Sequence, residues 1–123
     1  MTIKEVCKKY NITADTLRYY EKIGVIPDVN RTSGGIRDYN EEDIKWVENA
    51  LCMRNAGLPV GAISEYVRLY RMGNDTLLER KVLLESQRAE LIKQIEHMQE
   101  TVERLNHKIS KYEEAIVTGE LDC

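Results

Sequence analysis

Residues 13–39 read TADTLRYYEKIGVIPDVNRTSGGIRDY, and this stretch decides the fold. Thr13 is an N-cap residue ahead of a helix that runs to about Ile23, and Gly24 supplies the stop signal. After Pro27, residues 28–39 surround a Thr-Ser-Gly-Gly turn, which predicts a short hairpin. A helix followed by such a wing has the size to reach a groove of duplex DNA and the phosphates beside it.

The segment before this stretch predicts a shorter helix. Thr2 and Glu5 form a capping box at the start of a helix over about residues 3–9. A turn around Asn11 separates it from the helix that begins after Thr13. Two short helices joined in this way predict a helix-turn-helix whose second member is the recognition helix.

The segment after the wing predicts three more helices. Asn40 caps the first, which Gly57 ends, and a second begins at Leu58-Pro59 and ends near residue 73. Thr76 and Glu79 predict another capping box, which opens a helix running to about Val117.

The last helix carries a heptad seam. Apolar residues recur every seven positions, with a second set at the complementary core positions, and only Lys81 and Arg88 interrupt the pattern. Roughly 40 residues at about 1.5 Å each make a rod of about 60 Å, which needs a partner to cover its seam. The pattern leaves parallel and antiparallel pairing open. The predicted dimerisation residues are Leu84, Leu91, Ile95, Met98, Val102, Leu105, Ile109 and Tyr112.

These elements predict an all-α fold with a small β-wing: a winged helix-turn-helix head joined to a long C-terminal coiled-coil dimerisation helix. The expected boundaries are a DNA-binding domain over 1–72, the coiled-coil helix over 73–117 and a short tail over 118–123.

Charge and composition limit the functional classes. The net charge is −3, yet residues 1–39 hold seven Lys or Arg against five acidic residues, so the head carries a local +2 that suits phosphate. No signal run, membrane span, nucleotide loop or catalytic triad is present, which predicts a cytoplasmic protein that is not an enzyme and needs no cofactor. The three cysteines, Cys7, Cys52 and Cys123, lack the spacing of a disulfide framework or a zinc site.

Taken together, these residues resemble the MerR family of bacterial transcription regulators. The resemblance rests on the run Thr16-Leu17-Arg18-Tyr19-Tyr20-Glu21, on Gly24-Val25-Ile26, on the wing ending Arg37-Asp38-Tyr39, on the turn Arg54-Asn55-Ala56-Gly57-Leu58 and on the final heptad helix. It implies a homodimer, paired antiparallel through the long helix, that binds a pseudo-palindromic promoter and activates by kinking the duplex, acting on RNA polymerase only indirectly. The DNA contacts it implies are Thr16, Arg18, Tyr19, Lys22, Arg37 and Tyr39.

The signal that such a regulator senses is expected at Cys52. From the residues alone, Cys52 lies at the edge of an apolar stripe, where it is either a buried, inert thiol or a partly accessible one. The short tail and lone cysteine are similar to the aldehyde- or electrophile-responsive branch of the family (alcohol dehydrogenase regulators, NmlR-like), which implies that Cys52 is the modified thiol. Cys7 is expected to pack, and His97 and His107 to be solvated.

Two alternatives stay open at this point. The first is a coiled-coil adaptor whose head binds protein, which would not need the basic head or Arg18 and Arg37. The second is a MerR-like regulator that senses a metal or another small molecule. Soft metals need two or more thiolates, and in this chain a second thiolate near the C-terminus would have to come from Cys123 of a second copy.

Overall fold

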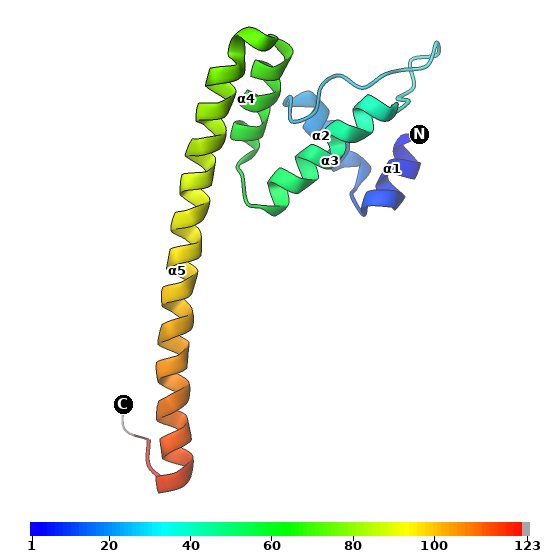
Figure 1. Cartoon of the computed structure of the whole chain (residues 1–123). Helices are drawn as coiled ribbons and strands as arrows, with labels where there is room; N and C mark the ends of the chain where they lie inside the picture. Colours follow the sequence, from blue (N-terminus) through cyan, green and yellow to red (C-terminus); the bar gives the residue numbers. More distant parts are fainter. Residues whose placement is uncertain (122–123) are drawn as a thin grey trace. The chain divides into compact units, whose positions relative to one another are not determined.

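The computed structural model of the chain describes residues 1–121 and is dominated by helices (Figure 1). In order these are α1 (Ile3–Tyr10), α2 (Ala14–Lys22), α3 (Glu41–Asn55), α4 (Val60–Arg71), the short 3-10 helix η1 (Asn74–Thr76) and α5 (Leu77–Thr118). The chain forms two compact units, one over Met1–Gln87 and one from Arg88 onward, and α5 contributes to both. The predicted fold class, a winged helical head with a long C-terminal helix, is confirmed.

Capping side chains begin the head helices where the sequence predicted. The Thr2 hydroxyl accepts the Glu5 amide at 3.2 Å, and the Glu5 carboxylate accepts the Thr2 amide at 2.9 Å. Asn40 and Asp43 form the same reciprocal pair at the start of α3. Thr13 caps α2 by accepting the Thr16 amide at 3.1 Å. Each cap satisfies an amide that the first turn of a helix would otherwise leave unpaired, so the helix ends are defined locally.

The wing is a hairpin with very little regular β-structure. Its one antiparallel bridge joins Arg31 and Arg37, and no longer strand forms within residues 1–121. The turn is closed by the Thr32 amide donating to the Ile36 carbonyl at 2.8 Å and by the Gly35 amide donating to Thr32 at 2.9 Å. Gly35 has a φ of +83°, a conformation that glycine adopts without strain. The wing therefore depends on contacts outside the hairpin for its position.

The core of the Met1–Gln87 unit is small and aliphatic, with one tyrosine. Because no phenylalanine is available, β-branched residues and leucine fill most of the space between α1, α2, α3 and α4. The buried apolar side chains are Val6, Leu17, Val25, Ile26, Val29, Tyr39, Val47, Ala50, Leu58, Ile63, Val67 and Leu69.

The joint between α4 and α5 differs from the predicted capping box. Thr76 is 3% exposed, and its hydroxyl donates toward the carbonyls of Leu69 (2.6 Å) and Gly73 (2.8 Å) instead of accepting the Glu79 amide. The prediction of a Thr76–Glu79 capping box is therefore wrong. The buried hydroxyl thus finds its partners among backbone carbonyls of the joint, as a buried polar group must, and does not cap the exposed start of α5.

The helix α5 is continuous from Leu77 to Thr118 and buries none of its residues within the single chain. The seam side chains are exposed over 40–66% of their surface at Leu84, Ile95, Met98 and Val102. None of the helices in residues 1–121 combines the length and apolar character needed to cross a bilayer.

Candidate nucleic-acid interface

Glu21 on α2 holds the wing against that helix. Its carboxylate accepts the Nε of Arg37 at 2.7 Å through Oε1, and the Val29 amide at 3.0 Å through Oε2. The guanidinium of Arg31 approaches the same carboxylate at 3.9 Å. One side chain of α2 thus binds three residues of the following loop and hairpin, on both sides of the turn.

This carboxylate is largely buried and yet charged. Its side chain is only 9% exposed. Burial alone raises the pKa of Glu21, but the hydrogen bonds from Arg37 and the Val29 amide, with the nearby Arg31 charge, outweigh burial and lower that pKa below its usual value. Glu21 is therefore ionised at neutral pH and offsets part of the positive charge of the wing.

Arg37 has a different environment from the one the sequence predicted. Its side chain is 23% exposed, and its Nε is committed to Glu21. The two terminal nitrogens of Arg37 form no hydrogen bond within residues 1–121, so they remain available to a phosphate. Arg31 is more exposed, at 44%, and its NH1 donates to the Gly35 carbonyl at 2.9 Å.

The outer face of α2 presents the other predicted contacts. Arg18 is half exposed, and among residues 1–121 it pairs only with Asp15, at 3.3 Å, on the same exposed face. Tyr19 is 51% exposed and Lys22 is exposed. Thr16 is half-buried, and its hydroxyl shares a 2.7 Å hydrogen bond with Thr13, so it is occupied at the start of the helix. Arg18, Tyr19 and Lys22 together form an exposed surface with two cations and one aromatic ring, which is the composition of a phosphate-binding face.

Tyr39 lies beneath the surface. It is 2% exposed, burial raises the pKa of its hydroxyl, and that hydroxyl has no hydrogen-bond partner among residues 1–121. Its backbone pairs with the N-terminus, since the Tyr39 amide donates to the Met1 carbonyl and the Met1 ammonium to the Tyr39 carbonyl, both at 2.7 Å. Tyr39 therefore anchors the base of the wing, and a direct phosphate contact from it stays a prediction.

The α2 helix is fixed from its other end by α4. The Ser64 hydroxyl donates to the Ile23 carbonyl at 2.7 Å, and Gly24 turns the chain there with a φ of +81°. A Cβ at Gly24 would lie 3.2 Å from the Ser64 Oγ, so a larger residue would meet both backbone strain and crowding.

Aromatic stacking connects α3, α4 and the first turns of α5. The rings of Trp46 and Tyr70 meet edge to face with centroids 4.9 Å apart, and the Arg80 guanidinium lies 5.1 Å from the Tyr70 centroid. Arg80 also donates to Thr76 (3.1 Å) and to the Gly73 carbonyl (3.1 Å). The start of α5 is thus held by both charge and packing.

The cysteines and histidines lie in different environments. Cys52 on α3 is exposed, so the interpretation that it is buried is wrong, while Cys7 is half-buried. His97 and His107 are both exposed, as predicted, and Cys123 lies outside the described residues. Among residues 1–121, no three His, Cys, Asp or Glu side chains are grouped to hold a metal ion.

Sequence reasoning missed Glu21 as a functional residue. It belongs to the Tyr-Tyr-Glu run that was quoted, but its partners lie 8 and 16 residues away, across a hairpin. An acidic residue near the end of α2, followed by two arginines in the predicted wing, was the available signal.

The geometry of a helix-turn-helix with a clamped wing agrees with sequence comparison. Residues 1–69 match the family described as "MerR HTH family regulatory protein", and residues 45–108 match "MerR, DNA binding". The chain belongs to the MerR family. It is thus a DNA-binding transcription regulator and not an enzyme.

Individual relatives agree with the assignment to the MerR family. The chain is 52% identical over 92 residues to the HTH-type transcriptional regulator AdhR of Bacillus subtilis, covering 75% of this chain and 66% of that relative, just under two thirds of its length. A solved structure of a putative MerR family transcriptional regulator from Listeria monocytogenes superimposes with a TM-score of 0.89, at 41% identity, covering 97% of this chain and 90% of the other. HiNmlR, described as a MerR family regulator lacking the sensor domain and bound to promoter DNA, gives a TM-score of 0.82 at 30% identity, covering 98% and 95%.

The Glu21 clamp predicts a pH-dependent loss of stability. Glu21→Gln should lower the free energy of unfolding by about 1–3 kcal/mol at pH 7, the size of a hydrogen bond to a charged group. Because the folded-state pKa of Glu21 is lowered, the charged clamp stabilises the fold above the usual carboxyl pKa and is lost as pH falls through the lowered value. The difference in the free energy of unfolding between the parent and Glu21→Gln should therefore be smaller in urea titrations at about pH 3.

Glu48→Gln is the matched control, since Glu48 is exposed on α3. It should leave the unfolding curve within about 0.5 kcal/mol of the parent. Parent and Glu21→Gln curves that coincide at pH 7 would contradict the clamp.

Proposed function

We propose that the chain acts as a homodimer that binds a two-fold symmetric promoter site and activates transcription by distorting the DNA. The observation that carries this proposal is the clamped head: Glu21 holds the wing to α2 while Arg18 and Lys22 stay exposed on that helix. A helix and a wing held in one geometry can contact a groove and the neighbouring phosphates at the same time.

The exposed seam of α5 supports the homodimer. Its apolar side chains have no cover within the single chain, and burying a leucine-sized side chain is worth about 1.5–3 kcal/mol. A second copy supplies the same seam, so pairing buries both and fixes the spacing of two heads. Two heads related by a two-fold axis require a pseudo-palindromic site.

DNA distortion follows from that spacing. A rigid pair of heads bound at two half-sites can hold the duplex bent, at a cost of roughly 1–6 kcal/mol that phosphate contacts on both flanks offset. RNA polymerase then meets a promoter whose shape has changed, without a direct contact from this protein. The adaptor alternative is set aside, because the chain belongs to a DNA-binding family.

Cys52 is the proposed sensor of aldehydes or other electrophiles. Its exposure on α3 supports the proposal. The thiol sulfur adds to the carbonyl carbon of an aldehyde, and the carbonyl oxygen takes up a proton, which gives a hemithioacetal without any oxidant. Because α3 also carries Trp46, which packs on Tyr70, a group added on this helix would disturb the α3–α4 contact that leads to α5.

Metal sensing is the alternative. A Haemophilus influenzae relative described as "Probable heavy metal-dependent transcriptional regulator" is 32% identical over 107 residues. Exposure of Cys52 is the specific observation that favours the thiol proposal over it.

Arg18→Ala tests DNA binding. The variant should bind the duplex upstream of its own gene more than tenfold more weakly at moderate salt, because each dimer loses two phosphate contacts. The slope of log K against log salt should flatten by about 2, at roughly 0.9 per phosphate. Fluorescence anisotropy across a salt series measures both the affinity and this slope. Arg37 is a poorer choice, since its removal also breaks the clamp.

Lys93→Ala, on the exposed surface of α5, is the control and should bind with the parent's affinity and slope. If Arg18→Ala matches the parent in both, α2 is not the DNA-contacting helix.

Cys52→Ser tests the sensor. It should abolish the transcriptional response to formaldehyde in a reporter strain while leaving promoter affinity unchanged. Cys7→Ser, which alters the half-buried thiol of α1, should respond as the parent does. A full response from Cys52→Ser would overturn the sensor proposal and leave the DNA-binding proposal intact.

A further inference from the structure

The exposed face of α2 includes a carboxylate. The exposed residues of this helix are Asp15, Arg18, Tyr19 and Lys22, and their spacing along the chain places all four on one face. The Asp15 side chain is 98% exposed, and its carboxylate accepts the Arg18 NH1 at 3.3 Å. The face proposed to meet DNA therefore carries one acid beside its two cations and its ring.

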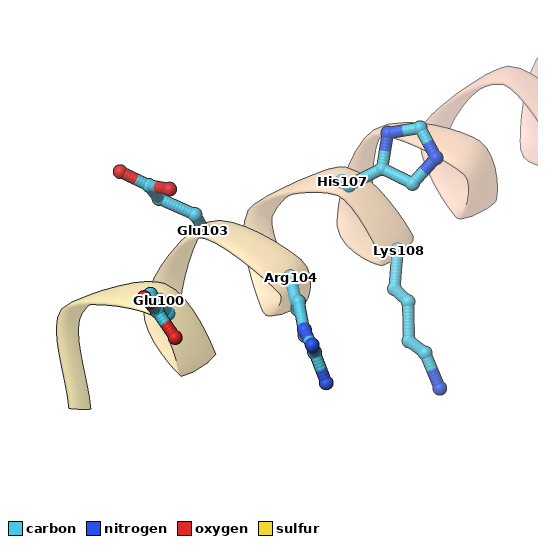
Figure 2. Close-up of a pocket in the computed structure, with 5 residues that line it drawn as sticks. All are labelled: Glu100, Glu103, Arg104, His107 and Lys108. Carbon is cyan, nitrogen blue, oxygen red and sulfur yellow. The ribbon is translucent and has the colours of Figure 1, made fainter. Parts of the chain in front are cut away.

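Mixed charge is ordinary on a helix face that stays in water, and α5 provides the comparison. Figure 2 shows five exposed side chains on successive turns of α5, with acids and bases on the same stretch of helix. They are Glu100, Glu103, Arg104, His107 and Lys108. Water and salt screen such charges. A carboxylate on a helix that approaches DNA is different, because it repels the phosphates that the neighbouring cations attract.

The fold of α2 does not depend on Asp15. Thr13 caps the helix by accepting the Thr16 amide, so the cap needs no carboxylate. An acid in the first turn interacts only weakly with the helix dipole when it is fully exposed. Its pairing with Arg18 is an exposed contact of the kind that contributes little to folding. Since a carboxylate has several acceptor sites, Asp15 can accept further hydrogen bonds while Arg18 stays bound to it.

We propose that Asp15 is a base-reading residue, which accepts a hydrogen bond from the N4 amino group of a cytosine in the major groove. This inference rests on the proposed DNA-binding function of α2 and names a base that the helix reads. In a helix-turn-helix, residues near the N-terminus of the second helix contact base edges, and Asp15 lies in the first turn of α2. Arg18 orients the carboxylate through NH1 and keeps its other N–H groups for a phosphate.

The chemistry of the base edges selects cytosine. An ionised carboxylate can only accept hydrogen bonds, whereas guanine and thymine present only acceptors as polar groups in the major groove, so both repel it. Adenine presents its N6 donor beside its N7 acceptor, and N7 would repel the second carboxylate oxygen. Cytosine presents its N4 donor beside a C5–H, where a second oxygen meets no acceptor. Asp15 is therefore expected to specify cytosine at one position of each half-site.

Asp15→Asn tests the assignment, because an amide can bond both N6 and N7 of adenine. The probes are duplexes from upstream of the gene in which each base pair of one footprinted half-site is replaced in turn, with the matching change in the other half-site. At one position the parent should prefer cytosine to adenine at least tenfold. Asp15→Asn should prefer adenine there and keep the parent's preferences elsewhere. Competition fluorescence anisotropy measures the affinities.

Asp15→Ala should lose the preference at that position only. Glu41→Gln removes an exposed first-turn acid of α3, so it is the matched control and should keep every preference of the parent. If both Asp15 variants keep the parent's preference at every position, or bind all duplexes more weakly by one common factor, Asp15 reads no base and the assignment is overturned. A parent that binds its promoter no better than an unrelated duplex would instead overturn the proposed promoter binding itself.

Discussion

One ion pair, between Glu21 and Arg37, holds the wing of the head against α2. The wing has a single β-bridge and cannot position itself, because one bridge supplies too few backbone hydrogen bonds to hold a hairpin rigid. Glu21 supplies a restraint from α2 through Arg37 and the Val29 amide, in addition to the backbone pairing of Tyr39 with Met1 at the base of the wing. It also offsets part of the positive charge of Arg31 and Arg37.

A second set of contacts connects α2, α3 and α4 to the first turns of α5. Ser64 fixes the end of α2, Trp46 and Tyr70 join α3 to α4, and Arg80 joins Tyr70 to η1. Each link is a short contact between neighbouring elements of the Met1–Gln87 unit.

Local sequence signals predicted much of this structure, but they could not predict which side chains pair when the partners lie far apart in the sequence. Thr2, Thr13 and Asn40 cap helices through atoms three residues away, so the chemistry is visible in sequence. The Thr76 hydroxyl instead donates to the Leu69 and Gly73 carbonyls, and Tyr39 is buried although it stands at the end of the wing. Glu21 and Arg37 are 16 residues apart, and only the turn between them reveals the pairing. Exposure of Cys52 depends on how α3 packs, which helical periodicity alone leaves ambiguous.

The most direct test of this account is a double-mutant cycle on Glu21 and Arg37, using Glu21→Gln, Arg37→Gln and the pair. Promoter affinity and the free energy of unfolding are measured for all four proteins. If the ion pair positions the wing, both quantities should show a coupling energy of about 1 kcal/mol or more, in the range expected for residues in direct contact. Effects that simply add in both measurements would show that the two side chains act independently, and would contradict the clamp as the organising contact of the head.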